Sequence, residues 1–426
     1  MHIAIIGAGI AGILSLHHAI KNNIQCTVFE QAKDVGGLWV YTDKVGTDEF
    51  GLPIHTSLYE GLRSNLPVQI MSSPEYPNNI TSYNYTSYLN HEDVLRYIQE
   101  FTDHFDLRKH IKFYNHVKKV KPIANNRWEL TSLNLLSKEE TKYQFDAVII
   151  ANGRRIVPKY PHIKGIETFN GIKLHSHDFR NTRMFTNQRV LVIGAGPSGL
   201  DITYHLSKVV HKVFFSNHLS YNISKFYPNN VKLKPDVDHV DKSNIHFKDG
   251  TTEEVDSILY CTGYKLSFPF LTPESGLTYE NQYVEPLYKQ IINIEHPTMA
   301  IIGLPFITSI FNLLDIQARF YIEYLKNPSK FPTKHQMYMD KQKYEELLRK
   351  IGRKVYQFHQ LGDLQETYYT SLSKIARIKN IRPVDIKMYE DRKNRAESDL
   401  AHYRGDLYNV INDENFTVVR SKIEFY

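Results

Sequence analysis

Short apolar runs alternate with a helical pattern at the start of the chain. Ile3–Ile6 is an uninterrupted, β-branched run, which is typical of a parallel strand buried on both faces. From Ile13 to Ile20 the apolar residues follow the spacing of a helix, and Cys26–Phe29 is a second apolar run. The pattern predicts a strand–helix–strand unit over residues 1–30.

The same order of elements returns in the middle of the chain. Arg189–Ile193 is the strand, a helical pattern follows Pro197, and Lys212–Phe215 is the second strand. Two further buried strands, Asp146–Gly153 and Val255–Gly263, each follow one of these units and end in glycine. We expect each of them to complete one α/β half of the chain.

Weaker patterns predict the remaining elements. A helix from His91 to about Phe105 carries acids in its first turn, and alternating segments around 111–120 and 128–133 predict antiparallel strands. Residues 74–90 are rich in Pro, Asn, Ser and Tyr and are expected to be irregular. After residue 266 the pattern predicts a strand at Thr298–Gly303, a helix at Asn312–Leu325, a linker over 327–335 and amphipathic helices at Lys341–Lys354 and Asp363–Ala376.

Composition narrows the class of protein. The 426 residues are 42% hydrophobic and 23% charged, which is ordinary for a soluble globular chain of two or three domains. Basic residues exceed acidic ones by 52 to 46, and no dense Lys/Arg block is present, so we expect no nucleic-acid partner. The two cysteines, Cys26 and Cys261, exclude a disulfide framework and are expected to be buried thiols.

The same features predict a soluble, cytoplasmic chain without a membrane anchor. The longest apolar stretch, Met299–Leu314, is too short to span a bilayer and is interrupted by Gly303 and Pro305. No signal peptide precedes the first strand. Four glycosylation sequences leave a secreted form open as an alternative; they lie at Asn79, Asn84, Asn222 and Asn415.

The first strand runs into Gly7-x-Gly9-x-x-Gly12, and the second ends at Glu30. In a βαβ unit Gly7 permits the tight turn, Gly9 lets a pyrophosphate approach the backbone, and Gly12 lets helix and strand pack closely. Glu30, eighteen residues after Gly12, stands where a carboxylate can accept hydrogen bonds from a ribose. We therefore predict a dinucleotide site here rather than a glycine-rich turn alone.

A second fingerprint, Gly194-x-Gly196-x-x-Gly199, lies 187 residues after the first, so it belongs to a second nucleotide domain. Its second strand ends in Ser216-Asn217-His218, without an acid. Hydroxyl, amide and imidazole groups can donate to a 2′-phosphate, which a carboxylate would repel, so this site favours NADP over NAD. No metal site is expected, because His175-x-His177 has no carboxylate or cysteine cluster nearby in the sequence.

Several motifs together resemble the flavin-containing monooxygenase family, over nearly the whole chain. The most specific is Phe-x-Gly-x-x-x-His-x-x-x-Phe/Tyr, present from Phe169 to Phe179 with Gly171 and His175 in place. Tyr260–Tyr264 is similar to the family's FATGY element, with Tyr and Cys as its first two residues. Gly36–Trp39 and Leu62–Pro67 also match, and the insect branch that N-oxygenates pyrrolizidine alkaloids is the most similar one.

The resemblance implies an α/β fold with two Rossmann-like dinucleotide-binding domains. The larger, FAD-binding domain is discontinuous (residues 1–157 and 266–426, the latter with C-terminal helices), and the smaller NADP-binding domain (158–265) is inserted into it. Pro158 and Pro161 mark the crossing between them. The residues implied for FAD are Gly7, Gly9, Gly12, Glu30, Gly37, Leu38 and Trp39; those implied for NADPH are Gly194, Gly196, Ser198 and Gly199, with Ser216 and His218 near the 2′-phosphate. An arginine common in that phosphate region of the family is absent, and Lys225 is a candidate substitute.

The reaction implied is the transfer of one oxygen atom from a C4a-hydroperoxyflavin to a soft nucleophile, with O₂ and NADPH as co-substrates. The expected substrate is a small molecule, a tertiary amine or alkaloid that is N-oxygenated, or a thioether. From the residues alone, an Asn in Ser-Asn-Leu-Pro is more often a turn residue. The resemblance reverses this preference and makes Asn65 the catalytic candidate, since its amide can donate to the peroxide and to NADP⁺. His175 and Phe179 are expected to be structural.

Three alternatives use the same layout. A disulfide reductase needs a redox cysteine pair, which this sequence lacks. A Baeyer–Villiger monooxygenase has a signature that ends in Trp, where Phe179 stands here. A non-catalytic protein that binds flavin and NADP, and the formation of homo-oligomers, are left open.

Overall fold

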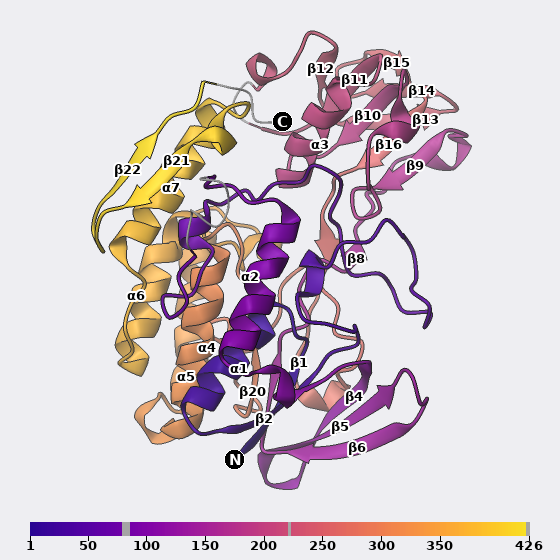
Figure 1. Ribbon diagram of the computed structural model, residues 1–426. Helices are drawn as coiled ribbons and strands as arrows, with labels where there is room; N and C mark the ends of the chain where they lie inside the picture. Colours follow the sequence, from indigo (N-terminus) through magenta and orange to yellow (C-terminus); the bar gives the residue numbers. More distant parts are fainter. Residues whose placement is uncertain (79–85, 220–222, 423–426) are drawn as a thin grey trace.

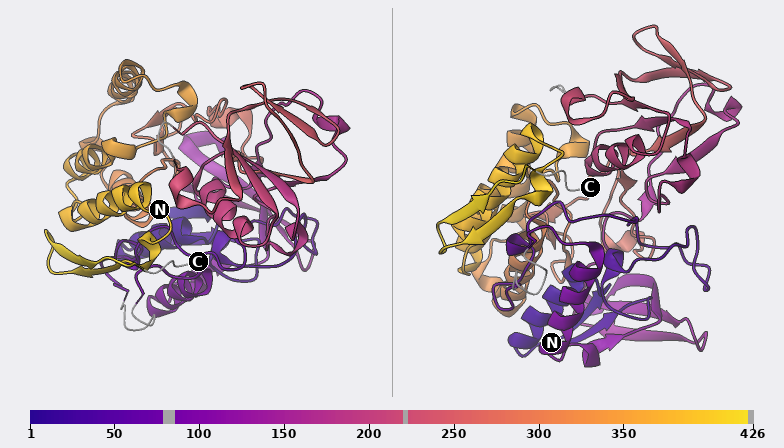
Figure 2. Two further views of the ribbon diagram at one scale, coloured as in Figure 1. Left: turned by 90° about the horizontal axis from the view of Figure 1, so that it is seen from above. Right: turned by 45° about the horizontal axis from the view of Figure 1, so that its top comes forward.

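The computed structural model describes residues 1–78, 86–219 and 223–422 (Figure 1). Part of the stretch 74–90, and the glycosylation sequences at Asn79, Asn84 and Asn222, lie outside the described residues. The middle of the chain forms one lobe, and both ends of the chain together form the other (Figures 1 and 2).

Strand β1 (His2–Ile6) lies inside a seven-stranded sheet. It pairs in parallel with β2 (Gln25–Phe29) on one side and with β7 (Ala147–Ile150) on the other, as the apolar runs predict. The remaining strands are β3 (Ile111–Lys112), β18 (Leu287–Tyr288), β19 (Ile292–Asn293) and β20 (Met299–Ile301), and the order is β18-β19-β20-β7-β1-β2-β3. β18, β19 and β20 are joined antiparallel, while β20 pairs in parallel with β7.

Both faces of this sheet are covered, which explains its continuous apolar strands. Ile3 and Ile5 face the helices α1 (Ile10–Lys21) and α4 (Ile310–Lys326), which pack on each other. Ala4 and Ile6 face the other way, into a core with Trp128. That core is closed by a three-stranded antiparallel sheet of β4 (Asn115–Ile123), β5 (Arg127–Asn134) and β6 (Glu140–Phe145).

The expectation of one strand around 111–120 was incorrect in part. The run is divided between β3, which joins the large sheet beside β2, and β4, which belongs to the small sheet. Tyr114 stands between them with φ +56°, a left-handed conformation that turns the chain from one sheet to the other.

The second lobe contains a five-stranded parallel sheet. Its strands, in the order β12-β11-β10-β16-β9, are β12 (Val231–Lys234), β11 (Lys212–Ser216), β10 (Arg189–Ile193), β16 (Ser257–Tyr260) and β9 (Ile172–His175). Helix α3 (Pro197–Ser207) packs on β10 and β11. A small antiparallel sheet completes the lobe with β13 (Val237–Asp241), β14 (Asn244–Phe247) and β15 (Thr252–Glu254).

The chain crosses between the lobes twice, and the two crossings lie side by side. β8 (Val157–Pro158) pairs antiparallel with β17 (Tyr264–Lys265), with Pro158 opposite Tyr264. The predicted fold, two parallel α/β units with the smaller one inserted into the larger, is confirmed. The boundaries after residues 157 and 265 stay predictions.

The remaining elements are helical, apart from one hairpin. They are α2 (His91–His104), α5 (Lys334–Lys350), α6 (Gln365–Ala376), α7 (Pro383–Ser398), β21 (Leu407–Val410) and β22 (Phe416–Val419). α5 begins at Lys334 rather than at Lys341, because Thr333 and Gln336 form a capping box at its start. α7 and the hairpin were not predicted. None of the helices described is long and apolar enough to cross a bilayer.

Candidate active site

The first glycine fingerprint forms a tight cradle between β1 and α1. Gly7 ends the strand with φ +100°, and a Cβ on it would stand 2.7 Å from the carbonyl oxygen of Ala151, just after β7. A Cβ on Gly12 would lie 1.9 Å from the carbonyl oxygen of Gly7. Only glycine fits at these two positions. The turn they form brings the N-terminus of α1 to the end of β1, as phosphate binding requires.

The Gly36–Trp39 corner lies directly on this cradle. The Gly36 amide donates to the carbonyl of Ala8 over 3.1 Å, and a Cβ on Gly37 would stand 3.0 Å from the Cα of Gly9. Gly37, Leu38 and Trp39 form a short 3₁₀ turn and are all partly exposed. The structure thus brings together two motifs that are separated in the sequence.

Glu30 follows β2 at the same edge of the sheet and is 8% exposed. Its two carboxylate oxygens accept hydrogen bonds from the amides of Ala8 (2.7 Å) and Ala32 (2.8 Å). A carboxylate can accept about four hydrogen bonds, so Glu30 retains capacity for a ribose diol. The two backbone bonds fix the carboxylate beside the cradle.

The second fingerprint repeats the geometry of the first. Gly194 has φ +101°, and a Cβ on it would stand 2.7 Å from the carbonyl oxygen of Cys261, just after β16. A Cβ on Gly199 would lie 1.8 Å from the carbonyl oxygen of Gly194. Gly196 differs, because a Cβ there would meet no protein atom within 4 Å. There is therefore open space at Gly196. Ser198, in the first turn of α3, is half-buried.

The two predicted phosphate contacts at the tip of β11, Ser216 and His218, differ in their exposure to solvent. Ser216 is buried, and its hydroxyl donates to the carbonyl of Pro235 over 2.8 Å. His218 is exposed, with Nε2 3.2 Å from a carboxylate oxygen of Asp236. The Lys225 ammonium lies over the ring of Phe226, 4.9 Å from its centroid. Of these three groups, His218 and Lys225 are exposed and Ser216 is buried.

The signature histidine is bonded to the second crossing. His175 is buried at the end of β9, where its Nε2 donates to the carbonyl of Gly263 over 3.0 Å and its Nδ1 accepts the amide of His177 over 3.0 Å. Burial lowers the pKa of His175 to about 4, so the imidazole is neutral. Phe179 is buried against Phe185 and the ring of Tyr59. These contacts agree with a structural role for the signature.

Sequence reasoning missed Arg180, which follows the signature. Its buried guanidinium donates to the backbone carbonyls of residues 42, 44, 56, 58, 177 and 179. Burial lowers its pKa, which Asp178 partly opposes. Arg180 thereby holds the turn-rich segment 42–58 against the second lobe. The hydroxyl of Thr56 in that segment also donates to the carbonyl of Leu38 over 2.9 Å.

Asn65 lies seven residues after the segment 42–58, in a turn that its neighbours stabilise. The Ser64 hydroxyl donates to the carbonyl of Leu66 (2.9 Å) and accepts the amide of Leu89 (3.0 Å). The Asn65 side chain is half-buried and makes no hydrogen bond within the described part of the chain. Its amide is therefore available to a ligand.

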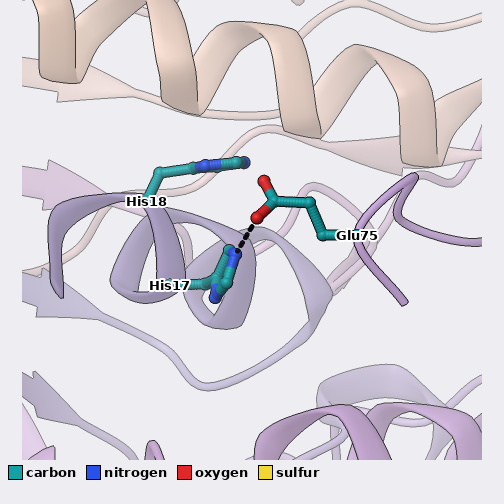
Figure 3. Close-up of side chains that lie close together, drawn as sticks. All are labelled: His17, His18 and Glu75. Atoms are coloured by element: carbon teal, nitrogen blue, oxygen red, sulfur yellow. Dashed lines mark ion pairs between the residues drawn. The ribbon is translucent and has the colours of Figure 1, made fainter. Parts of the chain in front are cut away.

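His17, His18 and Glu75 form a cluster with the residue types of a metal site (Figure 3). His17 Nε2 is 3.4 Å from a Glu75 oxygen, and the Lys21 ammonium is 2.6 Å from the same oxygen. His18 Nε2 is 2.7 Å from Asp315. Burial lowers the pKa of His17, Lys21 already pairs with Glu75, and His18 is engaged by Asp315. The cluster is therefore better explained as one ion pair beside two buried histidines.

Two hollows of the surface lie away from these motifs. One, of about 520 Å³, is lined by residues of the crossings and of 279–282, including Lys159 and Lys265. The other, of about 450 Å³, lies between residues 69–78 and the C-terminal hairpin. Neither is lined by a predicted site residue.

Comparisons with known proteins agree with this arrangement. A family model described as flavin-binding monooxygenase-like matches residues 1–230 and 223–394. Senecionine N-oxygenase of Tyria jacobaeae is 34% identical over 421 residues, covering 97% of this chain and 91% of that protein. Flavin-containing monooxygenase FMO GS-OX3 of Arabidopsis thaliana is 34% identical over 389 residues, covering 88% and 84%.

Solved structures give the same fold. S-allyl-L-cysteine S-oxygenase from Allium sativum superimposes with a TM-score of 0.89 at 27% identity, covering 95% of this chain and 94% of that chain. Tmm from Pelagibacter sp. strain HTCC7211 superimposes with a TM-score of 0.86 at 24% identity, covering 100% and 97%. Both alignments include the two lobes.

Proposed function

Because this chain belongs to the flavin-binding monooxygenase-like family, we propose that it transfers one oxygen atom from O₂ to the nitrogen of a tertiary amine or alkaloid. The chain is a flavin-dependent monooxygenase of the type that oxygenates nitrogen or sulfur, and its cofactors are FAD and NADPH. Its substrates are small molecules and O₂. The choice of nitrogen and of an amine substrate is the proposal.

The observation that carries the proposal is the segment that runs from one cradle to the other lobe. The Gly36–Trp39 corner covers the first cradle, the Thr56 hydroxyl bonds the corner, and Arg180 holds the carbonyl of Thr56. Asn65 follows, with a side-chain amide that bonds no other described residue. A monooxygenase has to hold a nicotinamide close to a flavin and to exclude water from the reacting atoms. This segment is suited to both tasks.

The first cradle fits FAD. Its turn is closed to any side chain at Gly7 and Gly12, and the carboxylate of Glu30 is fixed beside it with acceptor capacity left. We assign the pyrophosphate to Gly7, Gly9 and Gly12, the ribose to Glu30, and the flavin side to Gly37, Leu38 and Trp39. When bound, FAD supplies the redox and oxygen-activating chemistry that no side chain can supply.

The second cradle fits NADPH. The open space at Gly196 lies at the N-terminus of α3, where backbone amides and the helix dipole favour a phosphate. We assign the pyrophosphate to Gly194, Gly196, Ser198 and Gly199, and the 2′-phosphate to His218. Ser216 is the weakest of these assignments, because its hydroxyl is buried and engaged with Pro235.

We assign Asn65 the role of hydrogen-bond donor toward the reacting atoms. A neutral amide can donate without taking up a proton, and it holds developing negative charge best where water is excluded. The backbone around it is fixed by the hydrogen bonds of Ser64. A fixed donor needs no reorganisation when charge develops.

Oxygenation of a thioether is the second candidate. It is favoured by the similarity to an S-allyl-L-cysteine S-oxygenase over 95% of the chain. A Baeyer–Villiger reaction on a ketone has less support, since cyclohexanone monooxygenase shares the fold at 15% identity and Phe179 replaces the signature Trp. A non-catalytic binding protein would have no use for the Asn65 amide, which bonds no group among the described residues.

The test is an assay of the purified protein with a panel of tertiary amines, pyrrolizidine alkaloids, thioethers and ketones. We expect flavin absorbance, NADPH oxidation, and an N-oxide as the main product. A main product from a thioether or a ketone would replace the proposal by the corresponding alternative. A protein without flavin, or without any oxygenated product, would refute it.

We also propose a cytoplasmic location and treat self-association as a question for measurement. Cell fractionation tests the first, with recovery in the secreted fraction as the contrary result. Light scattering of the flavin-loaded protein measures the second.

A further inference from the structure

A buried carboxylate of the second lobe contacts two residues of the first. Asp201 lies on α3, two residues after the second fingerprint, and is 4% exposed. One of its oxygens accepts a hydrogen bond from the Tyr59 hydroxyl, and the other accepts one from the Arg404 guanidinium over 2.5 Å. Tyr59 is 3% exposed and Arg404 6%. The three polar groups are therefore enclosed between the helix that carries the second cradle and the rest of the chain.

Arg404 extends the contact to the catalytic candidate. Its Nε donates to the carbonyl of Ser64 over 3.2 Å, and Ser64 is bonded covalently to Asn65. The hydroxyl of Ser64 is already fixed by Leu66 and Leu89. The path from α3 through Asp201 and Arg404 thus ends on the backbone that presents the Asn65 amide.

The fold itself does not require an acid at this position. The two fingerprints share their spacing, and the residue of α1 that corresponds to Asp201 is Leu14, which is buried in the apolar core. Burial alone would raise the pKa of Asp201, but the Arg404 charge, His205 and the Tyr59 hydrogen bond lower it overall, so the carboxylate is ionised. A buried ion pair contributes little net stability compared with apolar packing, and its best-attested use is to fix one geometry.

We propose that Asp201, Arg404 and Tyr59 are positioning residues that couple the seating of NADP(H) on α3 to the placement of the Asn65 amide. The inference rests on the proposed function of the site. Since both Asp201 oxygens are engaged, a shift of α3 moves Arg404 and with it the Ser64 carbonyl. When the link is broken, NADPH is still oxidised, but the electrons are released as hydrogen peroxide (NADPH + H⁺ + O₂ → NADP⁺ + H₂O₂) instead of entering an oxygenated product.

The test compares Asp201→Asn, Arg404→Lys and Tyr59→Phe in the FAD-loaded protein. The first removes the charge. The second keeps a charge but lacks the planar guanidinium, whose separate nitrogens bond Asp201 and Ser64. The third removes one hydrogen bond while keeping the ring on Phe179. We expect the ratio of peroxide to oxygenated product to rise about tenfold in Asp201→Asn, the order expected for loss of a charged hydrogen bond. Arg404→Lys should behave similarly, Tyr59→Phe should show a smaller rise, and Tyr59→Phe added to Asp201→Asn should have little further effect.

Asp315→Asn is the matched control. Asp315 is equally buried and pairs with His18 (2.7 Å) and Arg319 (2.6 Å), but it joins α1 to α4 within one lobe. We expect it to destabilise the protein without changing the peroxide ratio. An Asp201→Asn ratio no higher than that of Asp315→Asn would overturn the proposal.

A binding readout separates this inference from the proposed function. Hydrogen exchange of residues 59–66 is measured with and without NADP⁺. We expect NADP⁺ to slow it in the wild type, to slow it less in Tyr59→Phe, and to have no effect in Asp201→Asn. Protection that is equal in wild type and both variants refutes the coupling. Protection that is reduced or lost in the variants, in a protein that yields no oxygenated product, supports the coupling and refutes the monooxygenase assignment instead. If Asp201→Asn does not fold, Tyr59→Phe decides.

Discussion

The imidazole of His175 donates to the carbonyl of Gly263 over 3.0 Å, so the signature before the second fingerprint is joined to the second crossing between the lobes. The other ring nitrogen accepts the amide of His177. Both bonds require one neutral tautomer. These bonds support the predicted structural role of His175 at the second crossing, where Tyr264 lies opposite Pro158.

The neutral state of His175 predicts a loss of stability in acid. Burial lowers its pKa to about 4, and burial lowers that of His359, which accepts the Val284 amide, to about 3. Between an unfolded value of about 6.5 and these folded values the unfolded chain binds more protons. The free energy of unfolding should therefore fall as the pH drops from about 6.5 to 4, and the loss should level off below the folded pKa values.

Urea unfolding monitored by fluorescence between pH 4 and 8 checks this prediction. His175→Gln, which keeps a donor but does not titrate, should reduce the pH dependence. Asn293→Ala is the control, because Asn293 is buried and hydrogen-bonded to the Ser275 carbonyl but does not titrate, so its removal should lower stability without changing the slope. A slope that is the same in His175→Gln and wild type would contradict the assignment.

Asn65→Asp should abolish oxygenation while NADPH oxidation persists. A carboxylate accepts hydrogen bonds but cannot donate one, and it repels developing negative charge, so product formation should fall about 10²-fold or more. The measurement compares NADPH consumed, peroxide released and product formed. Asn134→Asp is the control, since Asn134 caps a distant turn through its oxygen, which the variant keeps. Unchanged product formation would show that Asn65 is only a turn residue.

The cradles could be predicted from sequence because their geometry is local. Gly7 and Gly194 are needed by a turn of a few residues, and the strands beside them are marked by continuous apolar runs. The two strands expected to complete these halves do so: Ala147–Ile150 flanks β1, and Ser257–Tyr260 flanks β10. Short-range sterics and burial on two faces leave a clear pattern in the sequence.

Contacts between distant segments could not be predicted in this way. Arg404 lies 203 residues from Asp201, and its position carries no motif. Arg180 resembles any surface arginine in sequence, although it bonds carbonyls of two segments far apart. The helix at Pro383–Ser398 was missed because its mixed polar sequence shows little amphipathic pattern.

The carboxylate of Asp236 lies 3.2 Å from the Nε2 of His218. We therefore predict that removing Asp236 increases the preference for NADPH over NADH. The carboxylate competes with a 2′-phosphate for the imidazole and repels its charge, so Asp236→Ala should lower the KM for NADPH several-fold at low salt. The KM for NADH, which has no 2′-phosphate, should change little. Steady-state kinetics with both nucleotides measure the ratio.

Asp249→Ala serves as the control for Asp236→Ala, because Asp249 is an exposed acid of the same lobe that bonds Thr251. It alters net charge equally without touching His218. Equal changes in both variants would mean that only the overall charge matters. A KM for NADPH that rises in Asp236→Ala would place the 2′-phosphate elsewhere.

Adding one methyl group to each of the two glycines at the start of α3 should have different effects. A Cβ on Gly196 meets no protein atom within 4 Å, whereas one on Gly199 lies 1.8 Å from the Gly194 carbonyl. Gly196→Ala should therefore keep its thermal stability and flavin content but raise the KM for NADPH about tenfold or more, because the methyl group fills the space of the phosphate. Gly199→Ala should destabilise the protein by about 1–3 kcal/mol, as overpacking does. Thermal unfolding, flavin absorbance and NADPH kinetics distinguish the two outcomes, and a Gly196→Ala variant with an unchanged KM would show that NADPH does not use this cradle.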